Sequence, residues 1–113
     1  MSFIRYKKNN LFVENVPVKR LLSKFNTPFY LYSESGIIEN YKLFSNNFKK
    51  SKPLICFSVK ANSNIQILKV LRKMGSGADV VSGGELLKAI KSGIKPNKIV
   101  FSGVGKTEEE IRL

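Results

Sequence analysis

The stretch Leu54-Ile-Cys-Phe-Ser-Val-Lys-Ala-Asn-Ser-Asn64 decides how the rest of the chain is interpreted. Residues 54–59 are apolar or small and mostly good strand formers, which is typical of a strand buried on both faces in a parallel sheet. Lys60 follows at the C-terminal end of this predicted strand, where α/β folds build their sites. A partly desolvated amine there attacks carbonyl groups more readily. A solvated lysine at a strand end is the alternative interpretation.

The composition indicates one small domain in a reducing compartment. The chain has 113 residues, of which 42% are hydrophobic, enough for one core. The single cysteine, Cys56, excludes an internal disulfide framework, and the sequence holds no cluster of zinc ligands. Because histidine is absent, acid–base chemistry has to use Lys, Asp, Glu, Tyr or Cys. Without a membrane-spanning run or a secretory signal in residues 1–10, we expect a cytoplasmic protein with no membrane partner.

The net charge of +12 raises the question of a nucleic-acid partner. The lysines are scattered over the polar faces of predicted helices and over turns. They form no dense block of like charge and do not alternate with aromatic residues. We therefore expect solvated helix faces, and a basic RNA-associated protein stays open as an alternative.

Four segments repeat apolar residues with helical spacing, and each is preceded by a residue suited to begin a helix. The predicted first residues or caps are Pro17, Ser33 or Ser35, Asn64 and Ser82. The second helix is expected to end before Pro53, with two lysines at its negative end, Lys49 and Lys50. Capping-box spacing occurs in two places, Ser82 with Glu85 and Thr107 with Glu110.

Short strands are predicted at 11–13, 29–32, 54–59, 77–81 and 99–102. The last four alternate with helices, which is typical of repeated βα units, because parallel strands need a crossover. An open doubly wound sheet and part of a barrel both fit, and the pattern alone does not choose. Residues 1–27 are expected to form a strand and a helix that lead into this unit. The helix that begins after Thr107 favours a truncated architecture, because an isolated helix of about two turns is marginal.

Three motifs carry a resemblance to a known family: Phe57-Ser-Val-Lys-Ala-Asn62, Gly77-Ala-Asp-Val-Val-Ser-Gly-Gly-Glu-Leu86 and Phe101-Ser-Gly-Val-Gly-Lys-Thr107. Together they resemble the N-terminal barrel half of the diaminopimelate decarboxylase family. The segment Asn26-Thr-Pro-Phe-Tyr-Leu-Tyr32 is similar to the first barrel strand of that family. Ornithine and arginine decarboxylases belong to the same wider group, and alanine racemase is a more distant member. Ser63-Asn64 stands where the racemases continue with tyrosine, glycine and histidine, which argues against a racemase.

The resemblance implies a pyridoxal phosphate enzyme that converts meso-diaminopimelate to L-lysine and carbon dioxide. Its implied fold is α/β, with residues 28–113 forming about the first four βα units of a pyridoxal-phosphate-binding (β/α)8 TIM barrel, with parallel strands. In the family the lysine that matches Lys60 forms the Schiff base with the cofactor. Asp79, Glu85 and Ser82 are the other expected cofactor-binding residues. Each also has a structural reading, Ser82 and Glu85 as helix caps and Asp79 as a residue of a turn.

A full barrel needs about 250 residues, and its phosphate site typically uses loops after its last strands. We therefore expect the isolated chain not to decarboxylate diaminopimelate, and to need a complementing C-terminal chain or a homodimer. A non-catalytic half-barrel that binds pyridoxal phosphate or docks on a partner stays open. Cys56 is expected to pack inside its strand, and Lys106 to lie in a surface loop.

Overall fold

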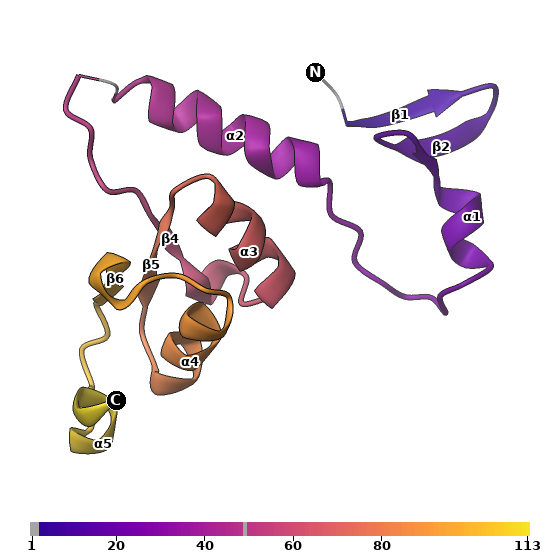
Figure 1. Ribbon diagram of the computed structural model, residues 1–113. Helices are drawn as coiled ribbons and strands as arrows, with labels where there is room; N and C mark the ends of the chain where they lie inside the picture. Colours follow the sequence, from indigo (N-terminus) through magenta and orange to yellow (C-terminus); the bar gives the residue numbers. More distant parts are fainter. Residues whose placement is uncertain (1–2, 49) are drawn as a thin grey trace.

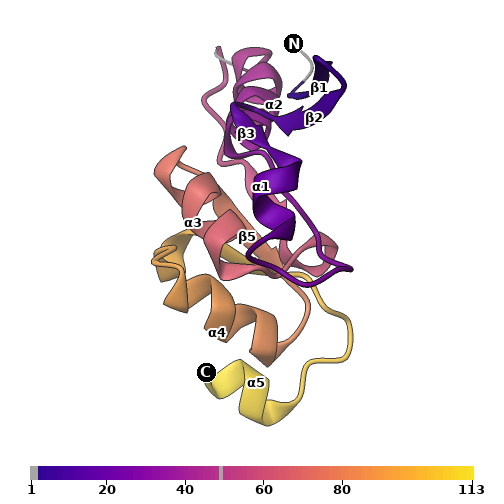
Figure 2. The ribbon, with the colours of Figure 1, turned by 90° about the vertical axis from the view of Figure 1, so that its right-hand side faces the viewer.

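The computed structural model describes residues 3–48 and 50–113 (Figure 1). Lys49, expected near the end of the second helix, lies outside the described residues. The described part is elongated, with principal extents of 55 × 39 × 21 Å and a radius of gyration of 17.0 Å. A compact domain of this size has a radius of gyration of about 13 Å. The first and last described elements, β1 (Ile4–Lys7) and α5 (Glu108–Arg112), lie at opposite ends of the molecule (Figures 1 and 2).

The N-terminal part is a small antiparallel sheet followed by one helix. Of the predicted strands, 11–13 is confirmed within β2, while β1 and β3 on either side of it were not predicted. The helix α1 begins directly after Pro17, which serves as its N-cap residue, and ends three residues before Phe25. The elements are β1 (Ile4–Lys7), β2 (Asn10–Val13), β3 (Val16–Pro17) and α1 (Val18–Leu22).

The strand predicted at 29–32 is wrong. These residues run as a linker without regular structure between α1 and α2 (Figure 1). Their aromatic composition suits a strand, but a strand also needs a partner for its backbone hydrogen bonds. The parallel sheet has the order β4 (Cys56–Ser58), β5 (Gly77–Val80), β6 (Ile99–Phe101), so no strand pairs with the outer edge of β4 within the described residues. Tyr30 is accordingly 89% exposed.

The helix α2 (Glu34–Asn46) begins where its cap was predicted. The hydroxyl of Ser33 accepts a hydrogen bond from the Gly36 N–H at 2.9 Å, which settles the choice between Ser33 and Ser35 as cap. The carboxylate of Glu14, from the turn after β2, accepts hydrogen bonds from the Ser33 hydroxyl at 2.7 Å and from the Ser35 N–H at 2.8 Å. These two bonds fasten the N-terminal sheet to the first turn of α2.

The C-terminal part contains the predicted parallel sheet, with β5 between β4 and β6. Three of the four predicted parallel strands therefore form within the described residues, and each is shorter than predicted. Asn64 caps α3 by accepting from the Gln66 N–H at 2.9 Å, as expected. The elements are β4 (Cys56–Ser58), α3 (Ile65–Lys73), β5 (Gly77–Val80), α4 (Gly83–Lys91), β6 (Ile99–Phe101) and α5 (Glu108–Arg112).

The core lies between this sheet and two helices, α3 and α4, which lie side by side on one face of it (Figure 2). Ala78 and Val80 of β5 are fully buried against this helix layer. They pack in one cluster with four other buried apolar side chains, Val59, Leu68, Ala89 and Ile94. Within the described residues, no helix is both long enough and apolar enough to cross a membrane.

Gly77 is placed where the three strands come closest together. A Cβ atom at this position would overlap the carbonyl oxygen of Lys98 and would lie 2.8 Å from the sulfur of Cys56. Because the Lys98 oxygen belongs to the backbone that enters β6, it cannot rotate away. Glycine is therefore the residue that lets β5 lie between its two neighbours.

Candidate functional site

Lys60 lies where β4 ends, as its position after a predicted strand indicated. The chain turns there into a short 3-10 helix, η1 (Val59–Ala61), in which Val59 is fully buried and Lys60 is exposed. The buried Val59 anchors the turn in the core, so the next side chain lies outside it. Among residues 3–48 and 50–113, no group hydrogen-bonds or ion-pairs with the Lys60 ammonium. The amine is therefore open to a ligand.

The loop after Lys60 is held from two sides. The side-chain oxygen of Asn62 accepts from the Asn64 N–H at 3.1 Å, which sets the entry into α3. The ammonium of Lys88, on α4, donates to the hydroxyl of Ser63 at 2.8 Å. Sequence reasoning missed Lys88, because it lies 25 residues from Ser63 and carries no motif. The loop is thus fixed to both helices that cover the sheet.

Asp79 lies in the central strand, β5, opposite Ser58 of β4 and Val100 of β6. It is half-buried, and its carboxylate accepts a hydrogen bond from the Ser102 hydroxyl at 2.5 Å. Burial first, and then the negative charge of Asp79, raise the pKa of the Cys56 thiol. Cys56 pairs with Gly77, two residues before Asp79, so Asp79 and Cys56 lie on the same face of the sheet, opposite to the face of the buried Ala78 and Val80.

Ser82 and Glu85 shape the turn between β5 and α4. The hydroxyl of Ser82 accepts from the Glu85 N–H at 3.3 Å, so Ser82 is the helix cap. The carboxylate of Glu85 accepts from the Val81 N–H at 2.9 Å instead of from the N–H of Ser82. The capping box predicted here is therefore only half formed, because the carboxylate reaches one residue further back.

Glu110 of α5 closes the same turn from outside, a contact that sequence reasoning missed. One of its carboxylate oxygens accepts from the Gly83 N–H at 2.7 Å, and the other from the Thr107 N–H at 3.1 Å. The bond from Thr107 completes the capping box predicted for α5. Hydrogen bonds from the Gly83 N–H and then from the Thr107 N–H lower the pKa of Glu110.

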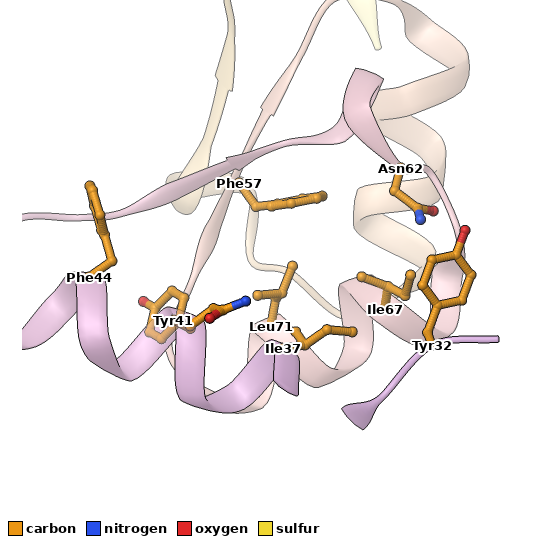
Figure 3. Close-up of a pocket in the computed structure, with 9 residues that line it drawn as sticks. Tyr32, Ile37, Tyr41, Phe44, Phe57, Asn62, Ile67 and Leu71 are labelled. Atoms are coloured by element: carbon orange, nitrogen blue, oxygen red, sulfur yellow. The ribbon is translucent and has the colours of Figure 1, made fainter. Parts of the chain in front are cut away.

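An apolar cavity of about 340 Å³ lies next to this loop, between α2, β4 and α3 (Figure 3). Asn62, two residues after Lys60, lies at one end of it beside the ring of Tyr32. Burial, and to a smaller extent the Cys56 thiolate charge, raise the pKa of Tyr41 in its wall. The other lining residues are Ile37, Asn40, Phe44, Phe57, Ile67 and Leu71.

The predicted site residues therefore gather at one edge of the sheet. Lys60 and Asp79 lie at the C-terminal ends of neighbouring parallel strands, and Ser82 and Glu85 lie in the turn after the second of these strands. This edge carries an exposed amine at the end of β4 and a half-buried carboxylate in the neighbouring strand, β5. The chemistry of this pair fits the aldehyde end of pyridoxal phosphate, which a lysine amine holds covalently. The N–H groups of Val81, Gly83 and Glu85 already donate to side chains, so the turn is not prepared for a phosphate.

Comparison with known proteins gives a family match over the part of the chain that holds this site. Residues 34–113 match the family described as pyridoxal-dependent decarboxylase, pyridoxal binding domain. The chain is 44% identical to the diaminopimelate decarboxylase of Haemophilus influenzae over 111 residues, which are 98% of this chain and 27% of that protein.

Solved structures agree with this match. The diaminopimelate decarboxylase of M. jannaschii in complex with L-lysine superposes with a TM-score of 0.90 at 39% identity, over 96% of this chain and 26% of that one. The Helicobacter pylori enzyme complexed with L-lysine gives a TM-score of 0.80 at 49% identity, over 83% of this chain and 24% of that one. The chain spans about a quarter of the length of these relatives.

Proposed function

The chain belongs to the pyridoxal-dependent decarboxylases through their pyridoxal-binding domain, and from this premise we propose that it supplies the cofactor lysine of a diaminopimelate decarboxylase. The fold is the predicted one, the N-terminal part of the α/β barrel of this family, and pyridoxal phosphate is the cofactor of the family. The division into residues 1–27 and a barrel part from residue 28 remains part of the proposal.

The observation that carries the proposal is the free amine of Lys60 at the strand end next to Asp79. Lys60 holds the aldehyde carbon, and exposure at the sheet edge leaves it accessible to exchange with a substrate amine. The Asp79 carboxylate stabilises positive charge that develops at this edge. Ser82 and Glu85 remain proposed neighbours of the cofactor, and in this structure they hold the turn between β5 and α4. When bound, pyridoxal phosphate supplies the electron sink for loss of a carboxylate.

Meso-diaminopimelate is the proposed substrate and L-lysine the proposed product. The names of the relatives support the substrate, and the L-lysine in two related structures supports an amino acid at the site in those proteins. A complementing chain that corresponds to the other three quarters of these relatives is the proposed partner, and a second copy of this chain in a homodimer is the alternative. The single cysteine is consistent with the proposed cytoplasmic location.

A chimaera tests this function directly. Residues 1–113 replace the matching segment of the Haemophilus influenzae decarboxylase, and growth of a lysine auxotroph that lacks the enzyme is measured, together with carbon dioxide release. We expect growth when the chimaera carries residues 1–113 of this chain unchanged. We expect no growth when the same chimaera carries Lys60→Arg, which keeps the charge but forms no stable imine. Lys98→Arg, at a lysine that donates to the Gly75 carbonyl, is the matched control and supports growth. A chimaera that folds and carries Lys60 but releases no carbon dioxide refutes the proposal.

Binding of pyridoxal phosphate without catalysis is the second candidate, because the exposed amine of Lys60 can by itself hold the aldehyde carbon of the cofactor. The chimaera separates the two candidates. Selective borohydride trapping of pyridoxal phosphate on Lys60, together with a chimaera that is folded and inactive, supports the binding module and excludes the decarboxylase.

A further inference from the structure

The shortest contact at the site joins Ser102, directly after β6, to Asp79 of β5. The Ser102 hydroxyl donates to one carboxylate oxygen of Asp79 at 2.5 Å. Hydroxyl groups that donate to ionised carboxylates form bonds of about 2.5–2.7 Å, shorter and stronger than bonds between neutral groups. The contact therefore has the length of a charge-assisted hydrogen bond.

The backbone places Ser102 for this contact. Its N–H donates to the Val80 carbonyl oxygen at 2.9 Å, which extends the pairing of β5 with β6 one residue past β6. At the next position, a Cβ atom on Gly103 would lie 2.6 Å from the carbonyl oxygen of Val81. Glycine lets the chain leave β6 in close contact with the end of β5, so the serine stays beside the aspartate.

Asp79 has few other restraints on its side chain. Its cross-strand neighbours are Ser58 and Val100, and no lysine or arginine forms an ion pair with it in residues 3–48 and 50–113. A half-buried carboxylate with one hydrogen-bond donor depends on that donor for its orientation. Losing the donor frees the χ angles of the aspartate and leaves the carboxylate less well solvated.

We propose that Ser102 is a positioning residue, whose hydroxyl fixes the carboxylate of Asp79 toward the edge of the sheet where Lys60 holds pyridoxal phosphate. This inference rests on the proposed function and deepens it, because it makes Ser102, directly after β6, responsible for the orientation of the Asp79 carboxylate. The charge of Asp79 then favours the covalent attachment at Lys60 only while the Ser102 hydroxyl is present.

The test measures attachment of pyridoxal phosphate to the 113-residue chain in the absence of substrate. Pyridoxal phosphate is titrated into the protein, the adduct is reduced with borohydride, and its amount on Lys60 is determined by peptide mass spectrometry. Visible circular dichroism reports how rigidly the bound cofactor is oriented. The variants are Ser102→Ala, Ser102→Thr, Asp79→Asn and the double variant Ser102→Ala with Asp79→Asn.

We expect Ser102→Ala to weaken attachment at Lys60 about threefold to tenfold, the usual net effect of one such hydrogen bond, and to reduce the visible circular dichroism. Ser102→Thr keeps the hydroxyl and restores both. In the Asp79→Asn background, Ser102→Ala has no further effect, because the serine acts through the aspartate. Ser23→Ala, at a surface serine whose hydroxyl donates to the Arg20 carbonyl at 2.9 Å, leaves attachment unchanged.

Two results overturn the positioning role while the proposed function stands. The first is selective attachment of pyridoxal phosphate at Lys60 that Ser102→Ala does not weaken. The second is a loss of attachment on Ser102→Ala that is equally large in the native and Asp79→Asn backgrounds. If the native chain shows no preference for Lys60 over its other lysines, the positioning role fails, while the proposed function is decided separately by the chimaera. Should Ser102→Ala not fold, Ser102→Cys replaces it, since a thiol is a weak donor of similar size. Attachment as strong as in the native chain then counts against the proposal.

Discussion

Gly77→Ala is the substitution with the most clearly predicted effect on both stability and the site. The added methyl group would lie 2.8 Å from the Cys56 sulfur, where ordinary contact begins at 3.4 Å, and it would overlap the Lys98 backbone oxygen. The thiol can move by rotation, but the carbonyl cannot, so β5 and β6 have to separate. Overpacking of this kind costs about 1–3 kcal/mol, and we expect the upper half of that range because the obstacle is backbone.

Thermal unfolding followed by circular dichroism measures this loss. For a chain of this size, about 2 kcal/mol lowers the midpoint by roughly 10 °C. Gly105→Ala is the matched control, since nothing lies within 4 Å of the Cβ position there. Adding Cys56→Ala to Gly77→Ala removes the overlap with the thiol but not the overlap with the backbone. We therefore expect the double variant to regain only part of the lost unfolding temperature. If Gly77→Ala and Gly105→Ala unfold at the same temperature, the close approach of the strands is not what requires glycine at position 77.

Three further predictions concern the contacts that hold the site in place. Hydrogen bonds from the Ser33 hydroxyl and then from the Ser35 N–H lower the pKa of Glu14 below 4.5, so its contribution is complete above pH 4.5 and is lost as the pH falls through the lowered value. In thermal unfolding from pH 7 to pH 3, Glu14→Gln therefore lowers the midpoint at pH 7 and flattens the acid decline, whereas a curve parallel to that of the native chain contradicts this. Leu68→Ala, at a fully buried side chain, should reduce the free energy of unfolding by about 2–5 kcal/mol in denaturant titrations, and a loss below 1 kcal/mol contradicts the described core. Lys88→Met keeps the aliphatic stem and removes the donor to Ser63, so hydrogen exchange at 61–64 should accelerate by about fivefold; unchanged exchange contradicts the proposed restraint.

Local signals in the sequence were sufficient to predict where the longer helices begin. Ser33, Asn64, Ser82 and Thr107 each cap the helix predicted to follow them, because a cap contact spans only two or three residues. Local signals could not decide whether residues 29–32 form a strand. These residues have the composition of a strand, but pairing depends on a neighbour distant in the sequence, and the described residues provide none beside β4.

The same distinction separates the predicted from the missed site residues. Lys60 and Asp79 were predicted because each lies at or near the end of a recognisable strand, inside a motif that resembles a family. Ser102 also ends a predicted strand, but nothing local indicates that its hydroxyl meets a carboxylate 23 residues away. Glu110 was predicted as half of a capping box, while its second contact reaches Gly83, 27 residues distant.

The two-residue period of the strands explains which face of the sheet carries Asp79. In β5, Ala78 and Val80 are buried against the helix layer, so Gly77 and Asp79 lie on the other face. In β4, Phe57 packs toward the helix layer, as does the buried Val59 that follows it. After β4 the chain turns into η1, so Lys60 lies exposed at the C-terminal end of the strand that pairs with Asp79. Shifting β5 by one residue would move the Asp79 carboxylate into the apolar core, so the packing that stabilises the sheet also fixes which face carries this carboxylate.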